Sequence, residues 1–228
     1  LGTGMRFQAV KGNSPGLFVL QARIKGDLDL DHARRADGTA LPYLALMGCV
    51  FEGEVRLDFA HLRGLSLVGS RLTHLRARHA EIDGGVDISG LRSCEEEGEG
   101  TGADGKPLCH VDFQGARVRS GFVASHTRLV VPPKRRAGEL AVESPVYALD
   151  LGHACVEGSL VLTPDFEALG GISFELAKID GDVRAMGLKV QAVEACAIQG
   201  SNAGVGGNID FSCRNLMDGE IVRSDIEG

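Results

Sequence analysis

One short phrase recurs six times along this chain and restricts what it can fold into. The phrase alternates apolar and polar residues around a central glycine, in the pattern Ala-x-Ile-x-Gly-x-Leu-x-Leu. Its copies begin at Ala22, Cys49, Ala80, Ala154, Ala177 and Ala203. Alternation places the apolar side chains on one side of an extended strand, and self-similarity at a short period is typical of repeat architectures. We therefore predict a stack of short parallel strands.

The glycine at the centre of each phrase predicts a corner. It stands where the apolar alternation is interrupted, and glycine adopts backbone angles that are costly for other residues. Each phrase would then form two short strands joined by a bend, which is about half a coil. Half a coil cannot bury its apolar side alone, so the copies are expected to stack on one another.

Residues 55–82 indicate the length of a coil. Two sets of inward positions recur there at intervals of five: Leu57, Leu62, Leu67, Leu72, Ala77 and Ile82, and, two residues earlier, Val55, Ala60, Leu65, Ser70, Leu75 and Ala80. Four such steps lead from Ala60 to Ala80, which predicts about 20–22 residues per coil.

This pattern resembles the pentapeptide-repeat proteins and their looser bacterial relatives, over most of residues 17–228. The resemblance implies an all-β fold, a right-handed parallel β-helix solenoid with loop insertions. A β-sandwich is the alternative, but sandwiches lack a small residue that recurs in phase with a glycine. The 32 glycines of the chain oppose long helices.

The repeat runs nearly from end to end, so we predict one domain over 1–228, with residues 1–16 as a cap or lead-in. Two segments break the rhythm: 93–108, which is acidic and rich in glycine, and 132–145, which is bounded by prolines. Both are predicted as surface loops. Insertions in solenoids often cluster on one side and bind partners.

Two smaller features complete the organisation. A short interruption follows Ala33, with a turn expected at Asp37-Gly38. Near the C-terminus, S-D-I-E-G from Ser224 begins another copy of the phrase, so we expect the chain to be truncated in mid-repeat. An uncapped last coil exposes strand edges, which favours an end-to-end homodimer.

A cluster of arginines is the most pronounced charge feature of a chain whose net charge is −7. Between residues 56 and 79 the only acid is Asp58, whereas the arginines are Arg56, Arg63, Arg71, Arg76 and Arg78. Stacked coils would gather several of them on one wall, as a site for an anion or an acidic partner. The alternatives are a solvated face, or an acidic segment, 95–99, that folds back over the arginines.

Three acids, Asp27, Asp29 and Asp31, alternate along one expected strand. Their spacing of about 7 Å would suit a glycosidase acid pair or a calcium site. Sugar-processing surfaces usually offer aromatic platforms, however, and this chain has no Trp and two Tyr. Solvated acids on a strand exterior are the simpler interpretation.

The cysteines and their neighbouring histidines give only weak signals. Cys109-His110, and His153 with Cys155, could begin a metal site or a thiol–imidazole dyad, but neither has the spacing of a known motif. A Cys94–Cys109 disulfide is the alternative to reduced thiols in the cytoplasm, which we expect. We predict no catalytic residue, metal or cofactor.

These observations favour a non-catalytic interaction or scaffold module, a rigid rod that binds a macromolecular partner, most simply a protein, through its walls or loops. Two alternatives remain. A DNA mimic acting on an enzyme such as gyrase follows from the family resemblance, and a glycan-processing enzyme follows from the acid cluster. The acidic charge disfavours binding to nucleic acid, and no apolar run reaches the roughly 20 residues of a transmembrane helix.

Overall fold

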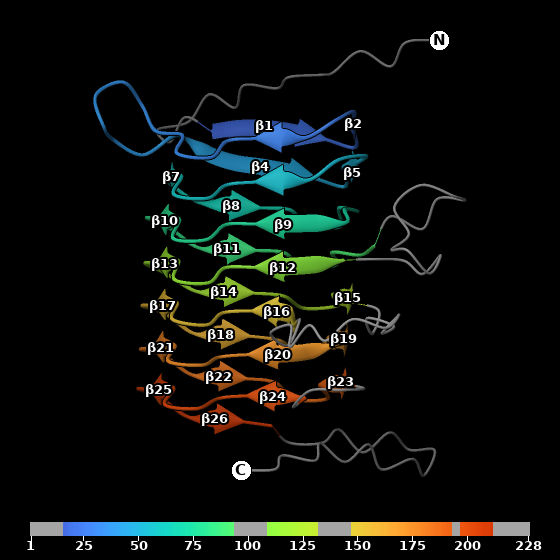
Figure 1. The fold of residues 1–228 in the computed structure, drawn as a ribbon, viewed down its shortest axis with the longest axis vertical. Helices are drawn as coiled ribbons and strands as arrows, with labels where there is room; N and C mark the ends of the chain where they lie inside the picture. Colours follow the sequence, from blue (N-terminus) through green and yellow to red (C-terminus); the bar gives the residue numbers. More distant parts are fainter. Residues whose placement is uncertain (1–15, 94–108, 132–146, 193–196, 212–228) are drawn as a thin grey trace, which may run out of the picture.

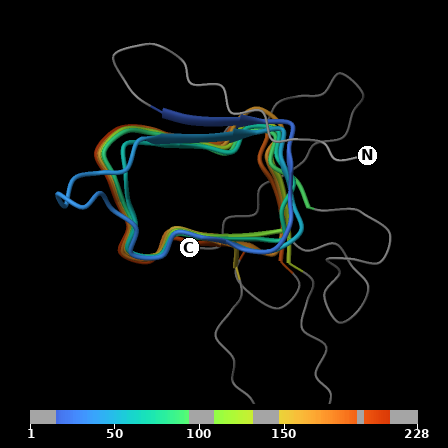
Figure 2. The same ribbon diagram turned by 90° about the horizontal axis from the view of Figure 1, so that it is seen from above.

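The computed structural model describes residues 16–93, 109–131, 147–192 and 197–211, which form an all-β coil of short stacked strands (Figure 1). The coil has a nearly rectangular cross-section with four walls (Figure 2). Seen from the N-terminal end, the chain runs clockwise as it recedes, so the coil is right-handed. The strands within each wall pair in parallel. The predicted parallel β-helix is confirmed.

We number the walls in the order in which the chain visits them. Wall 1 holds β1 (Gly16–Leu20), β4 (Tyr43–Met47), β8 (Leu65–Ser66), β11 (Val86–Asp87), β14 (Phe122–Val123), β18 (Leu160–Val161), β22 (Val183–Arg184) and β26 (Ile209–Asp210). Wall 2 holds β2 (Arg23–Ile24), β5 (Val50–Phe51), β15 (Arg128–Val130), β19 (Glu167–Leu169) and β23 (Lys189–Gln191).

The other two walls complete each coil. Wall 3 holds β3 (Leu28–Asp29), β6 (Val55–Arg56), β9 (His74–Arg76), β12 (His110–Asp112), β16 (Tyr147–Asp150), β20 (Gly171–Ser173) and β24 (Ile198–Gln199). Wall 4 holds β7 (His61–Leu62), β10 (Glu81–Ile82), β13 (Arg117–Val118), β17 (Cys155–Val156), β21 (Lys178–Ile179) and β25 (Gly204–Val205).

The five-residue step of the sequence corresponds to one wall. Each wall contributes two inward side chains, and all twelve inward positions predicted between 55 and 82 are at most 1% exposed. The polar member, Ser70, is satisfied inside the coil: its hydroxyl donates to the carbonyl oxygen of Leu46 at 2.6 Å and accepts from the amide of Cys49 at 3.0 Å. Burial of this apolar column is the main source of stability.

Alanines mark the start of wall 4 in successive coils. The amide of Glu81 donates to the carbonyl oxygen of Ala60, and the amide of Arg117 donates to that of Ala80, both at 2.8 Å. Ala60 and Ala80 therefore lie in adjacent coils, as the repeat predicted. The column continues through Ala116, Ala154 and Ala177, all at most 2% exposed.

The repeat glycines differ from the prediction in their physical role. Gly26 has a φ of 72°, but Gly158 and Gly181 lie outside the left-handed region. A Cβ on Gly158 would come within 2.6 Å of the backbone carbonyl of Ser120 in the preceding coil, and one on Gly181 within 2.7 Å of Gly158. The close approach of neighbouring coils at this corner requires glycine there, and the expectation of special backbone angles was wrong for these positions.

The interruptions of the coil lie at the positions that were predicted from the sequence. Nearly all of the predicted loops 93–108 and 132–145 lies outside the described residues, as do residues 1–15 and the segment from Ser224. The described part of the coil is interrupted after wall 2, at Ser93 and at Val131, and it resumes each time at the start of wall 3. Both insertions therefore join the same corner, in agreement with the expected clustering.

The short interruption after Ala33 is an excursion from wall 4, visible in Figure 2 as a blue loop beside the rod. Its turn is held by Asp37, whose carboxylate accepts from the amide of Thr39 at 3.0 Å and from its hydroxyl at 2.6 Å. The amide of Arg35 donates to the carbonyl oxygen of Thr39 at 3.0 Å. The predicted turn at Asp37-Gly38 is confirmed.

Candidate functional site

Walls 3 and 4 meet in a tight turn that presents one residue per coil to solvent. This residue lies immediately before the column alanine, and it has a φ of 53–67° in seven coils: His32, Phe59, His79, Gly115, His153, Leu176 and Asn202. The left-handed region is costly for residues with side chains. The stacking of the coils maintains it, because in the first six of these coils the amide of this residue donates to a carbonyl of the next coil, as from Phe59 to Arg78 at 2.9 Å.

Three of these residues form an exposed aromatic stack. The ring centroids of His32 and Phe59 lie 4.9 Å apart with an interplanar angle of 2°, and those of Phe59 and His79 lie 5.1 Å apart at 23°. The stack ends at Gly115, which has no side chain to continue it. The imidazole of His79 occupies the space that a Cβ at Gly115 would need. Phe59 is 53% exposed although it is a large apolar residue. We call His32, Phe59 and His79 the corner stack.

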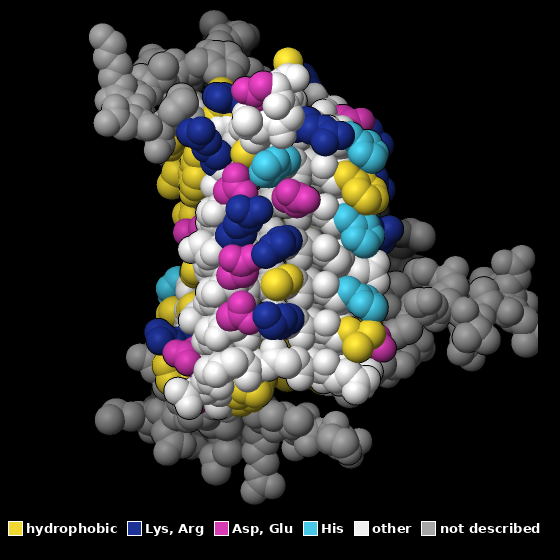
Figure 3. Space-filling model, turned by 90° about the vertical axis from the view of Figure 1, so that its left-hand side faces the viewer, with side chains coloured by type: hydrophobic (Ala, Val, Ile, Leu, Met, Phe, Trp, Pro, Cys, Tyr) yellow, Lys and Arg dark blue, Asp and Glu magenta, His cyan; other side chains and the backbone are white. Residues whose placement is uncertain are grey.

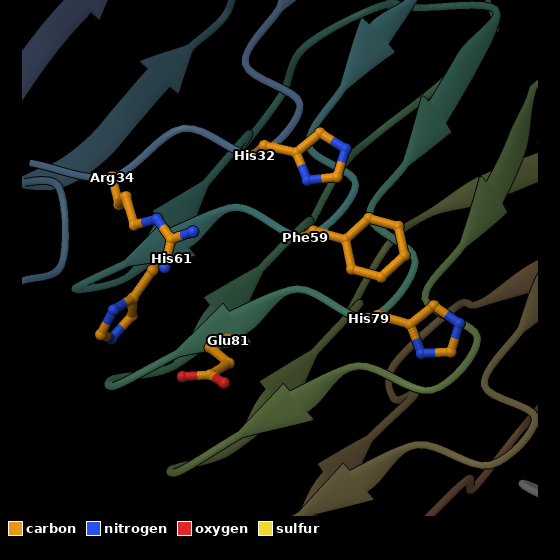
Figure 4. Close-up of a pocket in the computed structure, with 6 residues that line it drawn as sticks. All are labelled: His32, Arg34, Phe59, His61, His79 and Glu81. Atoms are coloured by element: carbon orange, nitrogen blue, oxygen red, sulfur yellow. The ribbon is translucent and has the colours of Figure 1, made fainter. Parts of the chain in front are cut away.

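A shallow hollow of about 270 Å³ lies between the corner stack and the outer face of wall 4. Figure 4 shows the three rings on one side and Arg34, His61 and Glu81 on the other. The second set comes from equivalent positions of three successive coils, since His61 pairs with Glu81 and the amide of His61 donates to Ala33. The hollow thus runs along the rod.

The charges around the hollow are unequally neutralised. His61 Nε2 lies 3.2 Å from Asp83 Oδ2, and Arg119 lies 3.6 Å from the same carboxylate. Further along wall 4, Arg117 binds Glu157 at 2.6 Å, and this hydrogen bond raises the pKa of Arg117. Figure 3 shows this face, where cationic and acidic side chains alternate. Arg34, by contrast, has no hydrogen-bond or ion-pair partner among the described residues.

The five predicted arginines are distributed over three walls. Arg56, Arg76 and Arg78 lie on wall 3, whereas Arg63 follows β7 in wall 4 and Arg71 lies in wall 2, in a bridge to Arg92. The expectation that these arginines share a wall holds for three of them.

The wall 3 arginines are also neutralised by more acids than the sequence count suggested. Arg56 binds Asp29, and Arg76 lies 2.7 Å from Asp58 and 3.3 Å from Asp31. The sequence count included only Asp58, because the other acids stand in neighbouring coils and outside the counted stretch. The segment 95–99 lies outside the described residues.

Arg78 contacts one member of a carboxylate pair on wall 3, in which Asp112 is buried and Asp150 is half-buried. Its Nε donates to Asp112 at 2.6 Å, which raises the pKa of Arg78. Asp150 is the partner of Asp112 in the next coil, and burial, with the charge of Asp112, raises the pKa of Asp150. Two carboxylates with different environments are typical of acid–base sites. Asp112 is only 2% exposed, however, so a substrate would not reach this member of the pair.

The acids considered for a glycan or calcium site, Asp27, Asp29 and Asp31, bind groups of the neighbouring coil. Asp27 accepts from the amide of Glu54 at 2.9 Å, and Asp31 accepts from the amide of Asp58 at 2.8 Å. The amide of Asp31 and the guanidinium of Arg56 lower the pKa of Asp29. A general acid needs a raised pKa, so the three carboxylates join coils and do not form an acid pair.

The cysteine–histidine pairs are also separated by the fold. Cys109 points into the core whereas His110 lies on the outer face of wall 3, so the two side chains cannot form a dyad. His153 stands in the exposed corner turn and Cys155 in β17. Cys94 lies outside the described residues. No group of three or more His, Cys, Asp or Glu suited to a metal ion occurs in the described ranges.

His110 takes part in a different contact. Its Nδ1 lies 2.8 Å from His74 Nε2, and His74 Nδ1 lies 3.6 Å from Glu54. Burial, together with His74, lowers the pKa of His110 to about 4. The paired imidazoles therefore favour the neutral form of His110, and they connect two coils across the first insertion.

Comparisons with protein-family models, with curated proteins and with solved structures find no match for this chain. The resemblance to pentapeptide-repeat proteins thus rests on the repeat pattern alone. Within the described part of the chain, no helix is long and apolar enough to cross a membrane.

Proposed function

We propose that this chain is a non-catalytic interaction module, which binds a protein partner along the corner of walls 3 and 4. The exposed Phe59, stacked between two imidazoles beside a hollow, is the observation that carries the proposal. Aromatic and arginine side chains contribute much of the energy of protein interfaces, and Arg34 adds an unpaired guanidinium to the same place. The corner continues with the exposed Leu176 two coils beyond Gly115.

The remaining outer surface supports this choice of face. On walls 3 and 4 most charged side chains join one coil to another, as Arg76 joins Asp31 and Asp58. Groups already paired offer little to a partner, because binding would exchange one set of contacts for another. A cytoplasmic location is part of the proposal and follows from the cysteine pattern of the sequence, which favours reduced thiols over a disulfide framework.

The two alternatives have less support. A DNA mimic needs a continuous negative surface, whereas wall 4 alternates in sign (Figure 3). A supercoiling assay of gyrase with excess protein tests that function. A glycan-processing enzyme needs an accessible acid pair, and Asp29 has a lowered pKa.

Site-specific photo-crosslinking tests the proposal. A benzophenone amino acid replaces Phe59 in one variant and Met186 in another. Met186 is the matched control, because it is an apolar side chain with 42% exposure beside the left-handed turn between walls 1 and 2, at the opposite corner. In cells of the source organism, we expect a discrete heavier adduct from position 59 and none from position 186. Equal adducts from both positions, or none from position 59, would contradict the proposal.

An end-to-end homodimer is a separate proposal about partners. Strands β1 and β26 lie at the two edges of the wall 1 sheet, and Ile209 in β26 is 56% exposed. Open strand edges favour pairing with a second copy. A light-scattering mass that rises towards twice 24.1 kDa with concentration would support it, and a constant monomer mass would count against it.

A further inference from the structure

We infer that the hollow beside the corner stack is a carboxylate-binding subsite, in which Arg34 binds an acidic side chain of the partner and the corner stack packs against a neighbouring aromatic residue. The inference rests on the proposed function and names the chemistry that the site recognises. It combines three observations: an unpaired guanidinium, an exposed aromatic ring, and a hollow open to both.

Arg34 provides the anchor. It is exposed on the excursion from wall 4, and no acid among the described residues binds it. Figure 4 shows its side chain above His61, pointing towards the corner stack from the opposite side of the hollow. A guanidinium presents two parallel N–H groups that match the two oxygens of a carboxylate. Neighbouring Arg35 differs, because it interacts with Asp37 in the turn.

The other groups that line the hollow determine which charge of a ligand is favoured at each of its ends. The imidazoles of His32, His61 and His79 can add positive charge but never negative charge. The one lining acid, Glu81, lies two coils from Arg34, about 10 Å along the rod, and it interacts with Arg117. An anion is thus favoured at the Arg34 end. The N–H groups of a bound peptide are favoured at the Glu81 end.

The corner stack accounts for the aromatic part of the ligand. The rings of His32, Phe59 and His79 stack on one another, so their edges face outward. An aromatic ring packs well against such edges in a tilted or T-shaped arrangement. A hollow of about 270 Å³ accommodates one ring and one carboxylate, which is less than a drug-sized ligand fills.

A peptide titration of the full chain tests the inference. The probe is acetyl-Phe-Glu-amide, and the matched control is acetyl-Phe-Gln-amide, which differs only in its charge. Binding is followed by the NMR signals of the histidine ring protons. We expect the Glu peptide to shift the His32 and His79 signals with at least about tenfold higher affinity than the Gln peptide. Added salt should weaken this binding.

Substitutions in the excursion from wall 4 test whether Arg34 binds the carboxylate of the peptide. Arg34→Gln should remove the difference between the two peptides, Arg34→Lys should retain part of it, and Arg35→Gln should leave it unchanged. Equal affinities for the two peptides in the unaltered chain, or loss of the difference in Arg35→Gln alone, would overturn the inference. A position-59 crosslink together with equal peptide affinities would preserve the interaction module and reject only its acidic ligand. Binding of 3-phenylpropionate without binding of the Glu peptide would assign the site to a free aromatic acid and would overturn the peptide ligand.

Discussion

Replacing Ile82 or Ile209 by alanine deletes the same atoms at two positions that the coils enclose differently. Ile82 is 1% exposed and lies between its partners Leu62 and Val118 in the coils on either side. Ile209 stands in β26, the last strand of the wall 1 sheet, and is 56% exposed. Any difference between the two variants therefore reports the enclosure of the side chain by stacked coils.

The structure gives the expected sizes of the two effects. Isoleucine to alanine removes three carbons, which at about 0.8 kcal/mol each corresponds to about 2.4 kcal/mol when the side chain is fully buried. At Ile82 a cavity term adds to this loss, because the hydrogen-bonded backbones of the neighbouring coils cannot close the space. We expect a loss of about 3–4.5 kcal/mol in the free energy of unfolding. At Ile209 less than half of the side chain is buried, and we expect about 1 kcal/mol.

Urea unfolding followed by circular dichroism measures both values. The midpoints of the two variants and of the unaltered chain, multiplied by a common m-value, give the changes in free energy. A loss at Ile82 at least twice that at Ile209 agrees with stacked coils. Losses that agree within about 0.5 kcal/mol would refute the inward assignment of Ile82.

Two further predictions concern a buried imidazole and a close approach of coils. Burial lowers the pKa of His110 to about 4, so the folded chain binds a proton at this imidazole less tightly than the unfolded chain does. The contribution of His110 to folding stability is therefore fully present above about pH 6.5, and it is lost as the pH falls towards 4. His110→Gln should therefore reduce the loss of urea stability between pH 7 and pH 5 by up to about 2 kcal/mol; equal pH profiles of the variant and the unaltered chain would contradict this. Gly158→Ala should lower the melting temperature by several degrees, since its Cβ would meet the backbone of Ser120 at 2.6 Å, whereas Gly204→Ala has open space and should change it little. Similar melting of the two glycine variants would argue against the close approach.

The inward positions of the coil could be predicted well, because each is determined by the spacing of residues close together in the sequence. Between residues 55 and 82 one wall follows another every five residues, so the period alone assigned Leu57, Ser70 and Ile82 to the inside. The glycines were located correctly, but the backbone angles expected of them occur at Gly26 and not at Gly158 or Gly181. Glycine is required where neighbouring coils approach closely, as at Gly158 beside Ser120. Such distances between coils cannot be inferred from a single copy of the phrase.

The candidate site was harder to predict because its members come from different coils. Arg78 meets Asp112, 34 positions later and beyond an insertion, and no local count of charge reveals such a pair. The corner stack did leave a signal, since His32, Phe59 and His79 each stand directly before a column alanine. The left-handed turn that lines them up appears only in the structure.

A disulfide built on Cys155 is the most direct test of the stacking on which every surface of this chain depends. Cys155 forms no disulfide with a described cysteine and lies on the outer face of wall 4, and Lys178 is its partner in the next coil. Parallel partners about 4.8 Å apart fall within disulfide range, whereas Glu81, two coils away, does not. Mild oxidation should therefore link Cys155 to position 178 in Lys178→Cys, as shown by peptide mass mapping, and should form no link in Glu81→Cys. A link to position 81, or none to position 178, would contradict the stacked coil.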